Sequence, residues 1–464
     1  MPTIAASLRA RRFPRSNRRI GEHFLTRYLA KATIVGAIGG LLFGFDTAVI
    51  AGTTQQLTSV FHLTANTLGL TVSIGLVGTV IGAMFSGILG QKIGGREALR
   101  IMAVLYLISS IGCALAPNWD ILMISRFIGG LGIGGSSVLG PVYIAELAPA
   151  KWRGRMVGLF QINIVIGILL AYLSNYLITT RNLGAHQWRW EFAVAIVPSV
   201  LFLVMLYGIP RSSRWLVTTN QTNEALEVLR LMGSPNSEEE LQEIIASVHL
   251  EQGLKPEPLF QRKYALPIFL AITVGMFNQL SGINAILYYS NYIFASAGFS
   301  SSSAALQSVA IGLVNLLATF LGMSLVDKLG RKTLLLIGAV GMVVALSGVA
   351  AIFYTNQPQA LLVWCLVLFI VFFAISQGSV IWVYIAEVFP SRVRSKGQSL
   401  GSSSHWVMNA LIAQTFPLIA MRSHATPFVF FAAMMAVQFF VVLTLYPETK
   451  GQTLEKIQAN FGIH

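Results

Sequence analysis

The sequence predicts an all-α membrane protein whose twelve transmembrane helices form two pseudo-symmetric halves of six. Of the 464 residues, 55% are hydrophobic and 11% are charged, whereas a typical soluble protein carries about 25% charged residues. A transmembrane helix needs about 20 mainly apolar residues, and twelve such stretches follow one another along the chain. Short motifs of the first half also recur in the second half at equivalent places, which indicates a duplication.

The twelve stretches divide the chain into five parts. They lie near 32–54, 67–90, 98–117, 121–144, 156–179, 190–209, 264–294, 303–326, 333–354, 361–386, 397–420 and 426–446. The parts are a basic N-terminal arm (1–31), a first six-helix half (32–209), a cytoplasmic helical linker (210–263), a second six-helix half (264–446) and a cytoplasmic tail (447–464). Within the linker, Ser237 followed by Glu240 predicts a capping box at a helix start.

The basic residues between the spans cluster in every second connection, which is the positive-inside pattern. The basic clusters are Lys92, Arg96 and Arg100; Lys151, Arg153 and Arg155; Lys328, Arg331 and Lys332; and Arg392, Arg394 and Lys396. The connections 55–66, 295–302 and 355–360 carry no charged residue. We therefore expect a multi-pass inner-membrane protein with both termini in the cytoplasm. The placement of the basic residues in alternate connections between spans accounts for the net charge of +14, so nucleic acid is not an expected partner.

One aspartate, Asp46, interrupts an apolar run that has no other charge from Thr33 to Gly90. A carboxylate inside the membrane costs about 2.5–3.5 kcal/mol on insertion scales, so it normally faces water, pairs with a cation or binds a proton. Arg126, the first cation of the fourth span, is its candidate partner, because we expect Asp46 to be the only acid well inside the first-half spans. Separation of the pair would favour protonation of Asp46. The alternative is a static pair that only fixes two helices.

Neutral amides and aromatic residues recur inside the spans, mainly in the second half. Such residues can donate and accept hydrogen bonds to hydroxyl groups and cover apolar ring faces. The Ser281-Gly282 pair can also loosen the seventh span and free backbone groups near a cavity. These residues predict a polyol pocket, although each amide alone could serve interhelical packing. The candidates are Gln161, Ile168, Asn278, Gln279, Asn284, Tyr288, Asn315, Trp382, His405, Trp406 and Asn409.

The duplicated motifs carry charges at the cytoplasmic ends of spans. The segment 143–146, Tyr-Ile-Ala-Glu, returns at 384–387, and a basic loop after the second span returns after the eighth. Opposite charges at helix ends can form a network that opens and closes with the protein, although an exposed pair contributes only about 0–1 kcal/mol. The alternative is that they only set topology. The candidates for this latch are Glu146, Arg153, Lys92, Arg96, Asp327, Arg331, Lys332, Glu387 and Arg394.

Together the motifs resemble those of the sugar porter family of the major facilitator superfamily, over residues 32–455. They are GLLFGFD (40–46), RFIGGLGIG (126–134), YIAELAPAKWRGR (143–155), QLSGIN (279–284), VDKLGRK (326–332), IAEVFP (385–390) and PETKG (447–451). The chain is most similar to bacterial monosaccharide–proton symporters of the xylose, galactose and glucose type. The resemblance implies the major facilitator fold and a proton acceptor at Asp46 that Arg126 modulates. It also implies sugar coordination by Gln161, Gln279, Asn284, Asn315 and Trp382.

We therefore expect an importer that carries a monosaccharide with a proton by alternating access. Ile168, where the xylose-type porter has a glutamine, favours a hexose, whereas Asn278 and His405 depart from the family pattern and leave the sugar undecided. Three alternatives stay open: a facilitator with a structural Asp46, a polyol or inositol symporter, and a sensor that does not transport. No P-loop or metal-ligand spacing appears in the sequence, so we expect no enzyme activity, cofactor or metal. We expect the functional unit to be a monomer.

Overall fold

The computed structural model describes residues 27–148, 153–234, 236–253, 257–355, 359–390 and 393–452. Most of the predicted N-terminal arm and tail, together with Lys151 and Arg392, lies outside these ranges, as does the side chain of Arg153. Within the described residues every regular element is a helix. The predicted all-α class is confirmed.

The first half contains five long helices and a sixth span built from two pieces. The long helices are α1 (Arg27–Phe61), α2 (Ala65–Ile93), α3 (Gly95–Leu115), α4 (Trp119–Leu147) and α5 (Arg153–Thr179). The sixth span follows as α6 (Gln187–Ala193) and α7 (Ile196–Met205). Three shorter helices then fill the linker region, namely α8 (Ser213–Thr218), α9 (Thr222–Met232) and α10 (Ser237–Gly253).

The second half breaks more of its spans than the first. The seventh span is divided into α11 (Ala265–Leu280), α12 (Ile283–Tyr288) and α13 (Ser290–Ser296), and the tenth into α16 (Gln359–Ile375) and α17 (Gln377–Glu387). The remaining spans are continuous: α14 (Ser301–Leu329), α15 (Arg331–Thr355), α18 (Arg394–Ala420) and α19 (Thr426–Leu445). Eleven spans among the described residues are long and apolar enough to cross a membrane. The twelfth expected span falls on α18, which has 27 residues but a more polar sequence.

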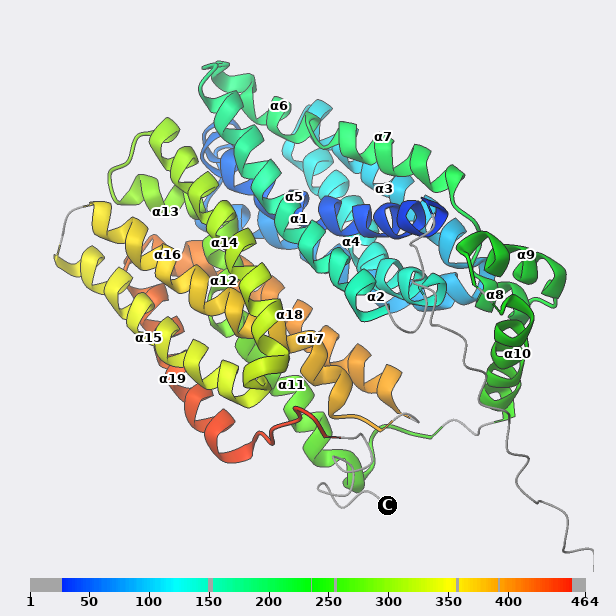
Figure 1. Cartoon of the computed structure of the whole chain (residues 1–464). Coiled ribbons are helices and arrows are strands. Elements are labelled where there is room, and N and C mark those ends of the chain that lie inside the picture. The colour runs from blue at the N-terminus through cyan, green and yellow to red at the C-terminus, as the bar shows by residue number, and fades with distance from the viewer. Residues whose placement is uncertain are drawn as a thin grey trace, which may run out of the picture.

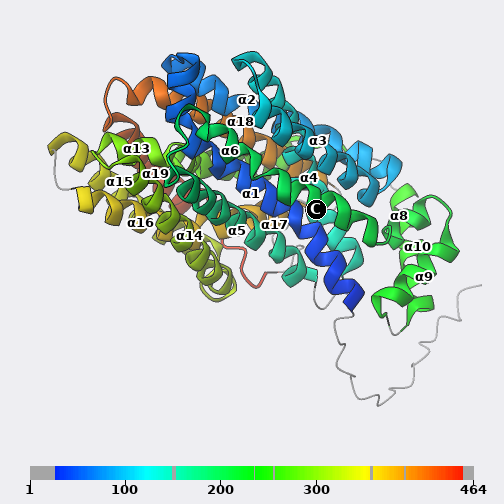
Figure 2. The same ribbon diagram turned by 90° about the horizontal axis from the view of Figure 1, so that it is seen from above.

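The two halves lie side by side (Figures 1 and 2), and α8–α10 project from one end of the first half. We call that end of the bundle the linker end and the opposite end, where α13 lies, the far end. Between the halves, α2 packs on α18 and α5 packs on α14. The α2–α18 contact is closest near the far end, where Ser73 Oγ donates to Gln414 Oε1 at 2.8 Å. A Cβ on Gly69 would lie 2.3 Å from the Gln414 carbonyl oxygen, so this closure needs a glycine.

The seventh span breaks at Ser281-Gly282, where the sequence indicated a loosened helix. Gly282 has a left-handed φ of 84°, a conformation that other residues adopt only at a cost. A Cβ at this position would also lie 2.3 Å from the Phe431 ring. The Ser281 hydroxyl donates to the Asn278 carbonyl and accepts from the Ile283 N–H, so it satisfies backbone groups that the break leaves free.

One local prediction in the linker was wrong. Ser237 is the first residue of α10 rather than its N-cap, and its hydroxyl donates to the Ser234 carbonyl at 3.0 Å. The preceding residue, Asn236, instead reaches forward to the Glu239 carboxylate. A capping box does form at the start of α2, between Thr64 and Thr67. The helix began one residue earlier than the Ser-x-x-Glu pattern implied, which removes the geometry of the box.

Candidate functional site

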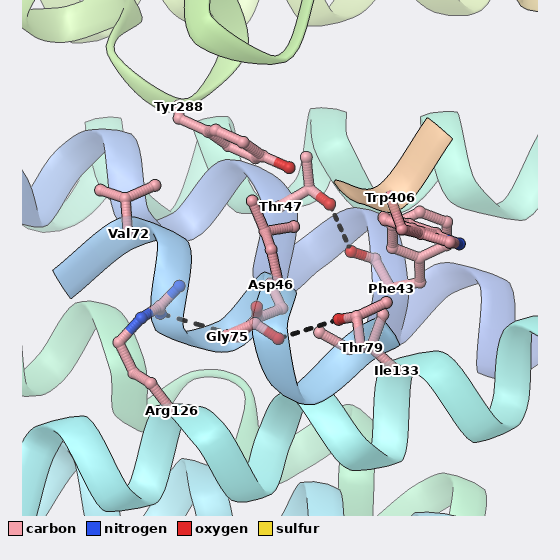
Figure 3. A pocket seen from close by; sticks show the side chains of 11 residues that line it. Phe43, Asp46, Thr47, Val72, Gly75, Thr79, Arg126, Ile133, Tyr288 and Trp406 are labelled. Carbon is pink, nitrogen blue, oxygen red and sulfur yellow. Dashed lines mark hydrogen bonds and ion pairs between the residues drawn. The ribbon is translucent and has the colours of Figure 1, made fainter. Parts of the chain in front are cut away.

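Asp46 and Arg126 lie across a small cavity in the middle of the first half (Figure 3). Arg126 Nη1 is 3.9 Å from Asp46 Oδ1, at the outer limit of an ion pair. The Arg126 side chain is 4% exposed, and 32% of the Asp46 side-chain surface remains free. Because α1 is deep inside the bundle, that free surface faces the cavity. The pair is therefore neither tight nor sealed.

Arg126 is held mainly by groups other than Asp46. Its Nε donates to the Thr71 carbonyl at 2.9 Å, and its guanidinium lies 5.8 Å from the centre of the Phe192 ring. Arg126 Nη1, the nitrogen nearest Asp46, has no hydrogen-bond partner among the described residues. A buried donor without a partner costs about 1–3 kcal/mol. The structure thus leaves a cation and a carboxylate close together but not bonded.

The cavity beside Asp46 also reaches residues of the second half. Its volume is about 20 Å³, which is enough for about one water molecule. Tyr288 of α12 and Trp406 of α18 line it together with Asp46 and Arg126. The candidate proton site and two of the candidate substrate residues therefore share one space.

Most of the candidate substrate residues form a hydrogen-bonded network around Gln279. Gln279 Nε2 donates to Asn278 Oδ1 at 3.0 Å and lies 3.2 Å from both ring nitrogens of His405. Gln279 Oε1 accepts from Asn284 Nδ2 at 2.9 Å. Residues from both pieces of the seventh span and from α18 thus meet where the helix is broken.

Aromatic rings flank this network. The His405 ring packs against Trp382 and Trp406, with centroids 5.1 and 5.0 Å away. Trp382 is 39% exposed, so one face of it is free to contact a ligand. Asn409 Nδ2 donates to the Tyr288 hydroxyl at 3.0 Å, while Asn409 Oδ1 is buried without a partner among the described residues. A buried acceptor without a donor, in a network that includes a partly exposed tryptophan, suits a ligand with hydroxyl groups.

Three candidates stand apart from the network. Gln161 and Ile168 lie on α5, and Asn315 lies on α14, the helix that packs against α5. Within the described residues, neither amide side chain has a hydrogen bond to the Gln279 network. Ile168 is buried at 4% exposure. The structure therefore brings the candidates from the seventh, tenth and eleventh spans together but does not connect these three to them.

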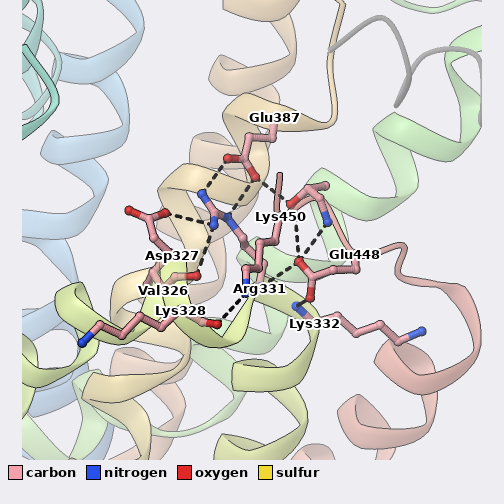
Figure 4. A network of polar contacts seen from close by, with 9 residues as sticks. Val326, Asp327, Lys328, Arg331, Lys332, Glu387, Glu448 and Lys450 are labelled. Carbon is pink, nitrogen blue, oxygen red and sulfur yellow. Dashed lines mark hydrogen bonds and ion pairs between the residues drawn. The ribbon is translucent and has the colours of Figure 1, made fainter. Parts of the chain in front are cut away.

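At the linker end, the second-half latch residues form a compact network (Figure 4). The Arg331 guanidinium donates to Glu387 Oε1 at 2.9 Å and to Asp327 Oδ1 at 3.1 Å. Thr449 Oγ1 donates to the other oxygen of Glu387 at 2.6 Å. Lys332 reaches the Leu443 carbonyl and Arg394 the Phe389 carbonyl. The acids and Arg331 are linked as expected, while these last two cations are bonded to backbone.

Glu448 belongs to the PETKG motif, and the sequence alone assigned it no role. Its carboxylate accepts from four backbone N–H groups, those of Arg331, Lys332, Thr449 and Lys450, at 2.9–3.0 Å. Burial acts to raise the pKa of Glu448, but these four donors stabilise the charged form and leave the pKa below its ordinary value. The tail is thereby fastened to the start of α15.

The first-half latch residues make fewer contacts with one another. Arg96 pairs with Glu97 at 2.7 Å and donates to the Ile209 carbonyl, while Lys92 is exposed. Glu146 interacts with Ser212 and with the charge of Arg214. The pairs of Arg96, Arg331 and Glu387 all remain within their own half. Glu97, which also pairs with Arg100, was missed, although its position beside two arginines signalled it.

A second acid inside the first half corrects one inference from the sequence. Asp46 was taken as the only acid well inside these spans, and this is wrong. Glu191 lies in α6 and is 0% exposed. It stands near the start of the sixth span, two residues after Arg189, and it was overlooked in the sequence. Two further buried amides were missed, Gln377 and Gln438, which bond to each other at 2.7 Å beside the break in the tenth span.

Comparisons with known proteins agree over nearly the whole chain. The family described as "Sugar (and other) transporter" matches residues 32–461. A D-xylose-proton symporter of Escherichia coli (strain K12) is 35% identical, over 95% of this chain and 97% of that protein. A glucose transporter, GlcP, of Staphylococcus epidermidis is 35% identical, over 92% of this chain and 95% of that protein.

Solved structures show the same fold. The inward open conformation of the xylose transporter XylE from Escherichia coli has a TM-score of 0.83 at 34% identity, over 93% of this chain and 100% of that one. The proton:xylose symporter XylE bound to 6-bromo-6-deoxy-D-glucose has a TM-score of 0.76 at 33% identity, over 94% and 99%. The chain belongs to the sugar transporter family of the major facilitator superfamily, and it is a multi-pass membrane carrier rather than an enzyme.

Proposed function

We propose that this protein imports a monosaccharide together with a proton by alternating access, and that Asp46 binds the proton. Relatives named as symporters of xylose and as a glucose transporter, at 35% identity over more than nine-tenths of the chain, support the substrate class. The substrate is a hexose or a closely related pentose, held by the Gln279 network.

The observation that carries this proposal is the shared cavity between Asp46, Arg126, Tyr288 and Trp406. A sugar that contacts Tyr288 or Trp406 changes the solvation of Asp46, because all three border one space. Protonation of Asp46 removes its charge and frees Arg126 from the weak pair. Sugar and proton binding are then linked energetically, and each raises the affinity for the other.

The arrangement of the two halves supports an inward-facing state. The far end is closed by the α2–α18 contact, where Gln414 bonds to Ser73 and Asn66. At the linker end, the Arg96, Arg331 and Glu387 pairs stay within their halves. The structures of XylE named as partially occluded inward open and as inward open have TM-scores of 0.82 and 0.83 to this chain, which agrees with this state. We assign the linker end to the cytoplasm on the positive-inside pattern.

The latch residues act in this cycle by exchanging partners. In the inward-facing state Arg331 binds Glu387 and Asp327 of its own half. When the linker end closes, the charges of Glu146, Arg153 and Arg96 approach those of Glu387, Arg394 and Asp327, and pairs across the halves become available. A single exposed pair contributes about 0–1 kcal/mol, so the cooperating network is the unit that biases the equilibrium. One chain in the inner membrane carries both sites, and we propose the monomer as the working unit.

The direct test uses a bacterial strain that lacks its own glucose and xylose carriers and expresses this protein. Adding the transported sugar to unbuffered, de-energised cells should make the medium more alkaline, because protons enter with the sugar. Accumulation of labelled sugar should collapse when an uncoupler is added. Saturable uptake with no alkalinisation and no effect of the uncoupler would establish a facilitator and contradict the proposal.

The substrate itself is identified by competition against labelled glucose. Hexoses should compete most strongly, because the apolar Ile168 stands where the xylose-type porter has a glutamine. Preferential competition by xylose or by myo-inositol would leave the carrier mechanism in place and replace the hexose assignment. Binding of sugar without any uptake would instead mark a sensor.

A further inference from the structure

We propose that Glu191 is a second proton-binding group of this carrier, on the far-end side of Asp46, and that it holds a proton in the inward-facing state. This inference rests on the proposed function, since it adds a second acid to the same coupling machinery. Glu191 is 0% exposed and has no ion pair within the described residues. An isolated buried carboxylate is strongly disfavoured, so such a group is normally neutral or paired.

The hydrogen bonds around Glu191 leave a place for a proton. Gln187 Nε2 donates to Glu191 Oε1 at 2.8 Å, while Glu191 Oε2 is buried with no partner among the described residues. Asn175 Oδ1 is also buried and without a donor there. An ionised carboxylate can only accept hydrogen bonds, whereas a protonated one supplies an O–H donor. A proton on Glu191 would supply a donor, and Asn175, whose side chain shares the space at Gly52 with Glu191, carries an acceptor that lacks one.

The geometry at Gly52 brings these groups together. A Cβ on Gly52 would lie 2.6 Å from Asn175 Nδ2 and 2.9 Å from Glu191 Oε2, so both side chains occupy the space that a larger residue would fill. Asn175 Nδ2 donates to the Val49 carbonyl at 3.1 Å. If the Asn175 amide were flipped, its oxygen would face the Val49 carbonyl oxygen, and two acceptors would repel each other. The Val49 carbonyl of α1 therefore fixes the orientation in which Asn175 Oδ1 has no donor.

No charged group on the neighbouring helices neutralises Glu191. Arg189 turns away, because it donates to the Ala114 carbonyl and lies over the Trp188 ring. Arg126 lies beyond Phe192, the residue after Glu191. Elements that pack against α6 carry Asp46 on α1, Tyr106 and Cys113 on α3, Tyr172 and Tyr176 on α5, and His186 in the preceding turn; Tyr28, Lys31, Arg96, Glu97, Arg100 and Arg155 lie on the same helices toward the linker end. Among the described residues, no hydrogen bond or ion pair joins Asp46, Tyr106, Cys113, Tyr172, Tyr176 or His186 to Glu191.

The position of Glu191 connects it to the first site and to the far end. Gly52 and Asp46 are six residues apart on α1, which is about 9 Å along the helix axis. Trp188, fully buried one turn before Glu191, packs edge-on against Phe61 at 5.6 Å and closes the far end above the carboxyl. Opening of the far end would separate α1 from α12 and α13 of the second half, and in the proposal water then reaches Glu191 from that side. The proton on Glu191 exchanges with the outside in the outward-facing state and stays bound in the inward-facing one, so Glu191 sets the external pH dependence of the cycle rather than carrying a proton across.

Infrared spectroscopy of purified protein tests protonation independently of transport. The spectra compare Asp46→Asn with the double variant Asp46→Asn, Glu191→Gln at neutral pH, so that Asp46 makes no contribution. We expect a protonated-carboxyl C=O band in the first that disappears in the second, with Asp120→Asn, which removes an exposed acid on α4, as the matched control. A band that is missing from Asp46→Asn, or that survives in the double variant, overturns the inference.

Transport then tests the role in coupling. Because glutamine mimics the neutral acid, Glu191→Gln should fold and keep sugar counterflow within about twofold of the parent, while the midpoint of uptake against external pH shifts by about one unit. An unchanged pH profile contradicts a coupling role and leaves Glu191 a structural group. If the parent itself shows no proton-driven uptake while the infrared band is present, the symport proposal fails and the protonation of Glu191 stands.

Discussion

At the scale of single residues, Gln279 is the hub on which the candidate sugar site depends. Its one amide meets Asn278, Asn284 and His405. The sequence could name these residues, because amides inside an apolar span are conspicuous. It could not say that they bond to one another, since that depends on how α11, α12 and α18 meet at the Ser281-Gly282 break.

Replacing Gln279 by alanine should therefore weaken sugar binding more than it slows turnover. It removes a ligand for the sugar and leaves the buried His405 and the partly buried Asn284 without this partner, which costs about 1–3 kcal/mol. We expect KM to rise by about tenfold or more with a smaller change in maximal rate. The matched control is Gln242→Ala, an exposed glutamine of α10. An unchanged KM would show that the network serves packing alone.

Glu448 gives a pH dependence whose sign follows from its surroundings. Its pKa is lowered from the ordinary value of about 4.5, so the folded protein binds this proton more weakly than the unfolded chain. The stabilisation is fully present above that ordinary value and is lost as pH falls through the lower pKa of the folded state.

We expect Glu448→Gln to reduce stability at pH 7 by ~1 kcal/mol, a value kept small because the carboxylate is partly exposed. The deficit should shrink toward zero as pH falls below the folded-state pKa, when the parent carboxylate is protonated as well. Thermal unfolding followed by size-exclusion chromatography at neutral and acid pH measures both. The control, Glu243→Gln, removes an exposed acid of α10; a Glu448→Gln deficit of the same size at all pH values would refute the charge-based explanation.

At the scale of elements, the broken helices place the functional groups. The seventh span is divided at Gly282 and the tenth at Ser376, and both breaks adjoin candidate site residues. The sequence indicated the first break, because Ser-Gly stands among amides. It did not indicate the second, since Ile375-Ser376-Gln377 contains no glycine or proline at the break itself and its irregular backbone arises from packing against α11 and α19.

Gly282→Ala should disturb the site without unfolding the bundle. The change forces a left-handed residue to carry a Cβ, at about 1–2 kcal/mol, and brings that Cβ to 2.3 Å from the Phe431 ring. We expect lower thermal stability and at least a severalfold loss of uptake. Gly87→Ala, where nothing lies within 4 Å of the new Cβ, should behave like the parent. Equal activity and stability of both variants would show that the break is not required.

At the scale of the whole molecule, the sequence predicted the architecture well and the conformational state not at all. Apolar stretches, alternating basic connections and the repeated motifs led to an all-α carrier with two halves. Which end is open depends on contacts between residues far apart in the chain, such as Ser73 with Gln414. Nothing in either local sequence encodes that contact. The same limit explains why Glu191 was overlooked, since its burial depends on how α1 and α5 pack against α6.

The central claim is that Asp46 couples the movement of sugar to the movement of a proton. The most direct measurement compares accumulation of labelled sugar in energised cells with sugar counterflow in de-energised cells, for the parent, Asp46→Asn and the control Asp120→Asn. The account predicts that Asp46→Asn keeps counterflow and loses gradient-driven accumulation, while the control retains both. Accumulation against the gradient that persists in Asp46→Asn would contradict it.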